Sequence, residues 1–127
     1  VGKELRRGEE EPLGRKLESV GVPILGKLTG EARAEGGDMF WLNETTLAIG
    51  LGFRTNAEGV RQIKAMLEPK GITVITTELP YGDGPAACLH LMSLLSLVDK
   101  DLAVVYPKYI ATPFWQELEK RNFKFIT

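Results

Sequence analysis

The sequence has little cysteine and little histidine, which narrows the chemistry that it can perform alone. Its 127 residues include one cysteine, Cys88, and one histidine, His90. A single cysteine excludes an internal disulfide and a thiolate metal cluster within the chain. A tetrahedral zinc site would need carboxylates for most of its ligands, which is unusual for zinc. We therefore expect no metal and no other cofactor.

Net charge and long apolar runs are scarce as well. The 16 basic side chains nearly balance the 17 acidic ones, which leaves a formal net charge of −1. Such a chain has no overall field to attract nucleic acid or an anionic membrane. No apolar run approaches the length of a transmembrane helix, and no signal-peptide pattern is present. We expect a cytoplasmic protein without nucleic-acid or membrane partners.

What the sequence does have is a regular succession of helical and β patterns. One helical pattern covers 9–20, a second begins near 56 and ends at Gly71, and a third begins near 113. The β patterns cover 22–28, 38–42, 46–51, 72–79, 88–97, 102–106 and 123–126. Run 88–97 fits either a buried strand or a buried helix, and the turn that follows it favours a strand. Thr55 with Glu58 predicts a capping box. Thr112 before Pro113 predicts an N-cap.

These elements repeat. Predicted helix starts near 9, 56 and 113 and strands near 22, 72 and 123 recur at roughly 50 residues, a period typical of repeat architectures. The repeating unit has the order ββαβ, with modules near 1–30, 35–80 and 86–127, the first without its hairpin. We therefore expect an α/β fold and a chain that is a fragment of a larger repeated architecture. Exposed module edges favour self-association into a homo-oligomer.

Candidate site residues cluster at the starts of two hairpins. Glu35 and Asp38 flank a Gly-Gly pair ahead of one hairpin, and His90 opens the next. Each has a simpler interpretation, as a surface acid, a turn residue and a core histidine. If the modules surround a common axis, however, the acids and the imidazole converge. A carboxylate next to an imidazole is a common acid/base pair because it fixes the tautomer.

Arg54 and Cys88 also leave alternatives open. Arg54 precedes a helix start, where a cation is mildly unfavourable, so it is either a surface charge or a ligand for a substrate carboxylate. The preceding G-x-G does not continue into a dinucleotide-binding motif. Cys88 would share a strand face with His90, yet a lone buried cysteine is usually inert.

Three motifs resemble the guanidine-modifying, or pentein, superfamily. They are "EGGDMFWL", "GLGFRTNAEG" and "LHLMS", in this order. The superfamily includes dimethylarginine dimethylaminohydrolases, arginine deiminases and amidinotransferases. The resemblance implies a five-fold α/β propeller, of which this chain would form about two and a half ββαβ modules. It also implies a small guanidino substrate that resembles arginine.

The resemblance further implies a mechanism in which a cysteine thiolate attacks the guanidinium carbon. His90 would protonate the leaving amine and activate water, and Glu35 would orient His90. Arg54 would bind the substrate's α-carboxylate, and Asp38 would shape the site more indirectly. Met92 stands where deiminases and amidinotransferases carry an acid, which favours the dimethylargininase-like branch.

The resemblance also leaves a gap, because the superfamily's nucleophilic cysteine lies beyond this chain and Cys88 matches no nucleophile motif. We therefore expect the chain alone to be inactive. One alternative is a non-catalytic binding module, since a ribosome anti-association factor has the same propeller. Another is a private catalytic pair of Cys88 and His90.

Overall fold

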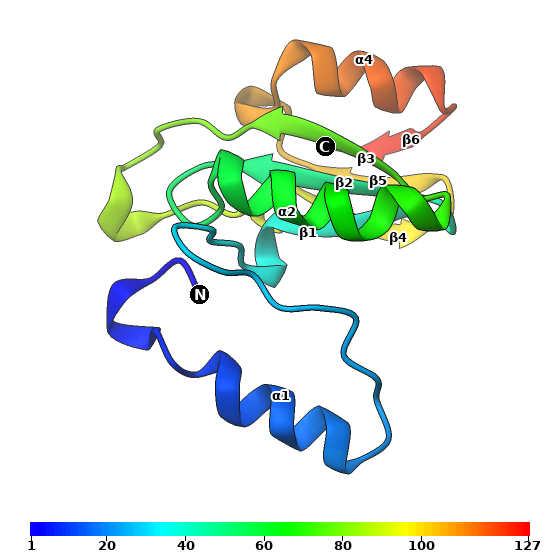
Figure 1. The fold of residues 1–127 in the computed structure, drawn as a ribbon. Coiled ribbons are helices and arrows are strands. Elements are labelled where there is room, and N and C mark those ends of the chain that lie inside the picture. The colour runs from blue at the N-terminus through cyan, green and yellow to red at the C-terminus, as the bar shows by residue number, and fades with distance from the viewer.

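The computed structural model describes residues 1–127 as an N-terminal segment followed by two three-stranded sheets with their helices (Figure 1). The α-helices are α1 (Glu10–Ser19), α2 (Ala57–Leu67), α3 (Leu91–Leu94) and α4 (Thr112–Lys120). The strands are β1 (Met39–Asn43), β2 (Thr46–Leu51), β3 (Thr73–Glu78), β4 (Leu95–Asp99), β5 (Leu102–Val105) and β6 (Lys124–Ile126). None of the helices is long and apolar enough to cross a membrane.

Both sheets have the same topology. In the first, β1 pairs antiparallel with β2, and β3 then pairs parallel with β2 after a crossover through α2. In the second, β4, β5 and β6 pair in the same way, with α4 as the crossover. Each hairpin also has its register irregularity at the same point, after Trp41 and after Leu97. The predicted ββαβ repeat is thus confirmed for two units, and the number of modules in a propeller stays a prediction.

Strand β2 is buried on both faces because the two units pack against each other. Leu47 and Ile49 point towards α2, where they form a small cluster with Val60 and Val74. The opposite face contributes to a larger cluster that joins the two sheets. That cluster consists of Leu42, Ala48, Leu91, Leu95, Ala103, Val105, Phe114, Leu118 and Phe123. Each large side chain buried there stabilises the fold by about 1.5–3 kcal/mol.

The N-terminal segment differs from the body. Helix α1 has no buried residue and lies apart from the sheets in Figure 1. The predicted strand at 22–28 was wrong: the segment is extended, but no strand lies beside it to pair with its backbone. Its apolar side chains are mostly exposed, although Gly26 lies against the Met66 side chain of α2. Directly after the segment, Thr29 N–H donates to Gln62 Oε1 at 2.9 Å.

The predicted strand at 88–97 was also wrong in its first half. Residues Leu91–Leu94 form one helical turn, α3, and only Leu95 begins the strand β4. Leu91 and Leu94 are buried on one side of this turn, a spacing that suits a helix and not a strand. Cys88, His90 and Met92 therefore do not share a strand face.

Both predicted helix caps differ in detail. Asn56 caps α2, since its Oδ1 accepts from Gly59 N–H at 2.8 Å, whereas Thr55 turns away from the helix. Helix α4 has Ala111 before its first residue, and no side chain caps it. Thr112 and Pro113 lie one position later than predicted.

Candidate active site

Asp38 ends a 3₁₀ turn, Gly36–Asp38, that leads into β1, and it is fully buried. Its Oδ2 accepts from Thr55 Oγ1 at 2.6 Å, and its Oδ1 accepts from the backbone N–H of Leu91 at 3.3 Å. The same Oδ1 lies 2.9 Å from His90 Nδ1. A buried carboxylate is tolerated when donors surround it. Asp38, in the turn before β1, therefore connects the first ββαβ unit to His90 and Leu91, which precede β4 in the second.

His90 lies between two carboxylates, one at each ring nitrogen. Because a carboxylate accepts, Nδ1 carries a proton and donates it to Asp38. On the other side, Nε2 lies 3.5 Å from Glu35 Oε2. The His90 side chain remains 30% exposed, so a small molecule can reach it. The imidazole is thus oriented for proton transfer at Nε2.

Gly37 allows this approach between the two units. A Cβ atom built on Gly37 would lie 2.9 Å from His90 Cγ, closer than real Cβ contacts allow. Of the Gly-Gly pair, Gly37 therefore permits the close backbone approach that the sequence indicated, whereas a Cβ on Gly36 would meet nothing within 4 Å. A side chain at this position would push the imidazole away from Asp38.

Glu35 has its own set of donors. Its Oε1 accepts from the backbone N–H groups of Gly2 and Lys3, each at 2.9 Å, and lies 3.6 Å from Arg54 Nη1. Burial alone would raise the pKa of Glu35, but the Lys3 N–H and the Arg54 guanidinium oppose it. With the smaller contributions of Gly2 and His90, the pKa of Glu35 falls below its usual value. The carboxylate is therefore ionised at neutral pH.

Arg54 follows β2. It is not a surface charge, because its side chain is only 15% exposed. Glu35 partly balances its charge. The guanidinium keeps donors beyond this one ion pair, because arginine has five N–H groups. Glu35, Asp38, His90 and Arg54, the four residues that the sequence singled out, thus form one connected cluster.

Cys88 is the only thiol, and its surroundings disfavour the thiolate. Burial raises the pKa of Cys88, and nearby Arg54 offsets this only in part. The Sγ atom points to its neighbour's carbonyl, Leu89 O, at 3.5 Å. A thiol with a raised pKa is a poor nucleophile at neutral pH, which argues against a catalytic pair with His90.

Sequence reasoning missed three contributors to this cluster: Thr55, Gly2 and Lys3. Thr55 was interpreted as a helix cap, but its hydroxyl donates to Asp38 and accepts from Glu35 N–H at 3.1 Å. Gly2 and Lys3 are more than 30 residues from Glu35 and act through backbone N–H groups. No side-chain pattern announces such donors, so the sequence carried no signal for them.

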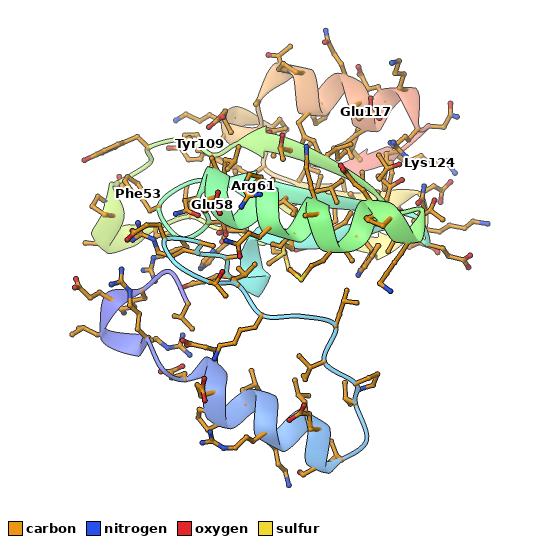
Figure 2. The ribbon with its side chains drawn as sticks, viewed as in Figure 1. Phe53, Glu58, Arg61, Tyr109, Glu117 and Lys124 are labelled. Atoms are coloured by element: carbon orange, nitrogen blue, oxygen red, sulfur yellow. The ribbon has the colours of Figure 1, made fainter.

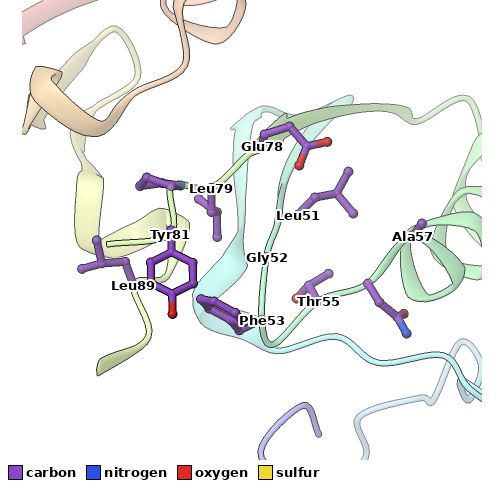
Figure 3. A pocket seen from close by; sticks show the side chains of 11 residues that line it. Leu51, Gly52, Phe53, Thr55, Ala57, Glu78, Leu79, Tyr81 and Leu89 are labelled. Carbon is purple, nitrogen blue, oxygen red and sulfur yellow. The ribbon is translucent and has the colours of Figure 1, made fainter. Parts of the chain in front are cut away.

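A hollow of ≈ 520 Å³ adjoins the cluster beyond Thr55 (Figure 3). The carboxyl ends of β2 and β3, the start of α2 and the 80–89 loop line it. Phe53 and Tyr81 meet there edge to face, with ring centroids 5.6 Å apart. His90, Glu35 and Arg54 do not line this hollow, so the polar cluster and the hollow are neighbours with different walls.

The repeated α/β units and the histidine between two acids agree with the guanidine-modifying, or pentein, superfamily, to which the comparisons with known proteins assign the chain. Within it, the family model described as arginine deiminase matches residues 19–124, and the chain belongs to that family. The resemblance drawn from the three sequence motifs is therefore confirmed.

Individual relatives agree with this assignment. The arginine deiminase of Lactococcus lactis subsp. lactis is 30% identical over 90 residues, which are 68% of this chain and 21% of that protein. The arginine deiminase of Bacillus cereus is 32% identical over 95 residues, which are 72% of this chain and 22% of that protein. The chain thus spans about a fifth of the length of these relatives.

Solved structures extend the likeness to the fold. Dimethylarginine dimethylaminohydrolase from Pseudomonas aeruginosa, in a cysteine-to-serine mutant complexed with citrulline, has a TM-score of 0.77 and 26% identity. The match covers 99% of this chain and 46% of that one. An amidinotransferase of saxitoxin biosynthesis from Microseira wollei has a TM-score of 0.65 at 11% identity. The match covers 98% of this chain and 42% of the amidinotransferase chain. At this identity it shows a similar fold alone.

Proposed function

We propose that the cluster of Glu35, Asp38, His90 and Arg54 forms the acid/base and carboxylate-binding part of a cysteine-dependent guanidine-modifying enzyme. Its substrate would be arginine or a substituted arginine. The observation that carries the proposal is the position of His90, whose two ring nitrogens face Asp38 at 2.9 Å and Glu35 at 3.5 Å. Arg54 stands next to this pair as a mostly buried cation.

In this mechanism a thiolate attacks the guanidinium carbon to form a tetrahedral adduct. His90, protonated at Nε2, gives that proton to the departing amine as its C–N bond breaks. Water then loses a proton to Nε2 and attacks the thiouronium carbon, which releases the thiolate and a ureido product. Asp38 holds the ring, and Glu35 offers a fixed negative charge beside Nε2.

Arg54 would bind the α-carboxylate of the substrate. Its side chain is largely shielded from water, and a charge-assisted hydrogen bond is stronger in such a place than at the surface. The Pseudomonas aeruginosa relative was seen with citrulline, a ureido amino acid that carries both groups the mechanism requires.

The thiolate itself would come from residues other than the 127 described here. Cys88 is poorly suited because burial raises the pKa of its thiol. Whether water or an amine accepts the carbon fragment decides between a hydrolase and an amidinotransferase. Met92 in place of an acid supports a dimethylargininase-like hydrolase, whereas the sequence relatives are arginine deiminases. A non-catalytic binding module is the second candidate, favoured by the unsuitable Cys88.

Ligand binding to this chain tests the proposal without the missing thiol. The ring signals of His90, the only histidine, report on binding by NMR. We expect L-arginine to perturb them, and Arg54→Gln to weaken binding of L-arginine but not of agmatine, which has no carboxylate. Arg61→Gln is the matched control, because Arg61 is an exposed partner of Glu58 on α2 (Figure 2). No response to L-arginine, or equal losses in both variants, would reject this role of Arg54.

Turnover separates the enzyme from the binding module. In the whole protein, His90→Ala should abolish release of ammonia or an amine from the substrate while the fold is kept. Full activity in this variant would exclude His90 as the acid/base group. Binding of arginine by a whole protein without any turnover would favour the binding module.

A further inference from the structure

The N-terminal strap, residues Val1–Lys3, lies against the acid side of the cluster. Two consecutive backbone N–H groups, those of Gly2 and Lys3, donate to one atom, Glu35 Oε1, at 2.9 Å each. The other oxygen, Oε2, is the one that faces His90 Nε2. The strap thus occupies one carboxylate oxygen and leaves the second for the imidazole.

The strap also fits closely against the segment that carries Arg54. A Cβ atom on Gly2 would lie 2.2 Å from the Arg54 carbonyl oxygen and 2.6 Å from Arg54 Cα. Both of these are backbone atoms, so no side-chain rotation would relieve the clash. Glycine is therefore required if the strap is to reach Glu35 in this position.

We propose that Gly2 and Lys3 are positioning residues, whose backbone N–H groups fix the Glu35 carboxylate in the rotamer that presents Oε2 to His90. The inference rests on the proposed function, in which Glu35 serves His90, but the contact itself exists without turnover. Backbone donors suit this task because they are neutral. They hold the Glu35 carboxylate without adding a positive charge that would repel the guanidinium of the substrate.

The charged groups around Glu35 make the two N–H donors important. Arg54 lies on the Oε1 side and His90 on the Oε2 side, and buried Asp38 adds a second negative charge on the far side of the imidazole. Cys88 is close enough for Glu35 to influence its titration. Without the strap, Glu35 would be free to turn fully towards Arg54 and away from His90.

Lys3→Pro removes one donor, and its ring Cδ takes the place of the amide hydrogen, so Glu35 Oε1 must also move back from residue 3. Lys3 has φ −76°, which a proline adopts without strain, and its carbonyl would still accept from Arg6 N–H. Lys3→Gln is the matched control, because it also loses the side-chain charge but keeps the N–H. The measurement is the pKa of Glu35, followed by NMR of its ¹³C-labelled side-chain carboxyl.

We expect the pKa of Glu35 to rise towards its usual value in Lys3→Pro and to stay unchanged in Lys3→Gln. Equal values in the two variants would overturn the inference, because the N–H would then contribute nothing. Gly2→Ala gives an independent reading and should also raise the pKa of Glu35. Its control is Gly14→Ala in α1, where an added Cβ meets nothing within 4 Å.

The result also separates this inference from the proposed function. A raised Glu35 pKa in Lys3→Pro, in a whole protein with no guanidine-modifying activity, would support the strap and reject the enzyme. In an active protein, Lys3→Pro should lower kcat more than it changes KM, since Arg54 still binds the substrate. An unchanged kcat together with a raised pKa would overturn the positioning role.

Discussion

The two ββαβ units of this protein form separate sheets of the same topology, but the segments that precede the two units differ. Residues 39–78 and 95–126 have the same strand order. Each has a crossover helix at the same position, α2 or α4, and a register irregularity at the same point of its hairpin. The first unit, however, follows a 3₁₀ turn that ends in Asp38, whereas the second follows a helical turn headed by His90. The sheets thus have the same topology, but the segments before them, which we call the lead-ins (Gly36–Asp38 and 90–94), present an acid in the first case and a histidine in the second.

This difference shows how one scaffold supports an asymmetric site. The apolar core holds the two units face to face through β2, which places both lead-ins at the same end of their sheets. Asp38 then reaches His90 and the Leu91 N–H across the boundary between units. The following variants test which part of this arrangement depends on the shared core and which depends on the lead-ins.

Loss of core volume should have the largest effect. Leu118 on α4 is fully buried in the cluster that joins both units, so Leu118→Ala should lower the free energy of unfolding by about 2–5 kcal/mol. Leu67→Ala on α2 should cost less, because Leu67 only borders the smaller cluster. Urea unfolding measures both. Equal losses would mean that the two units depend equally on their own helices.

Removal of the buried carboxylate should come next. Asp38→Ala leaves the Thr55 hydroxyl and the Leu91 N–H without their acceptor, at about 1–3 kcal/mol for each group that stays unpaired. Asp99→Ala in the second unit is the control, since Asp99 only accepts from the adjacent Lys100 N–H. A loss for Asp38→Ala no greater than for Asp99→Ala would contradict the structural role of Asp38.

The helix caps should give a smaller contrast between the units. Asn56→Ala removes the side-chain cap of α2, which alone should cost about 0.5–2 kcal/mol. It also removes the hydrogen bonds of Asn56 with Arg33 N–H and Glu31 O, which add to the loss. Thr112→Ala should have little effect, because no side chain caps α4. Thermal or urea unfolding of both variants checks the difference. A larger loss for Thr112→Ala would restore the cap that the sequence suggested.

The smallest effect should be the dependence of stability on pH through Glu35. Its pKa is lowered in the folded state, so its contribution is complete above the unfolded pKa of about 4.3 and is lost as pH falls through the folded pKa. Glu35→Gln should therefore lose less stability than the wild type between neutral and acidic pH. Glu44→Gln, at an exposed hairpin position, should follow the wild type. Parallel slopes for all three proteins would contradict the lowered pKa.

Much of this arrangement was predictable from local patterns. Strand periodicity and spacing gave the hairpins, crossover helices and repeat, because each element buries its own apolar face. The failures were non-local. Run 88–97 bends at α3, where Leu91 packs in the cluster that joins the two units, and 22–28 lacks a strand neighbour. Neither contact is revealed by the local sequence.

The candidate site was predictable as a set of residues but not as a geometry. The motifs indicated the four side chains, and the structure brings all of them together. The sequence expected Glu35 to orient His90, whereas the closer carboxylate belongs to Asp38. Distances of this kind depend on how two units dock, and the backbone donors of Gly2 and Lys3 leave no trace in side-chain patterns.

The central claim is that Asp38 in one lead-in orients His90 in the other, and the tautomer of His90 tests it directly. Long-range ¹H–¹⁵N NMR of the single histidine distinguishes protonation at Nδ1 from protonation at Nε2. We predict that whenever the wild-type ring carries a single proton, that proton is on Nδ1, and that Asp38→Ala loses this preference. A wild-type ring protonated at Nε2, or a tautomer that Asp38→Ala leaves unchanged, would contradict the account.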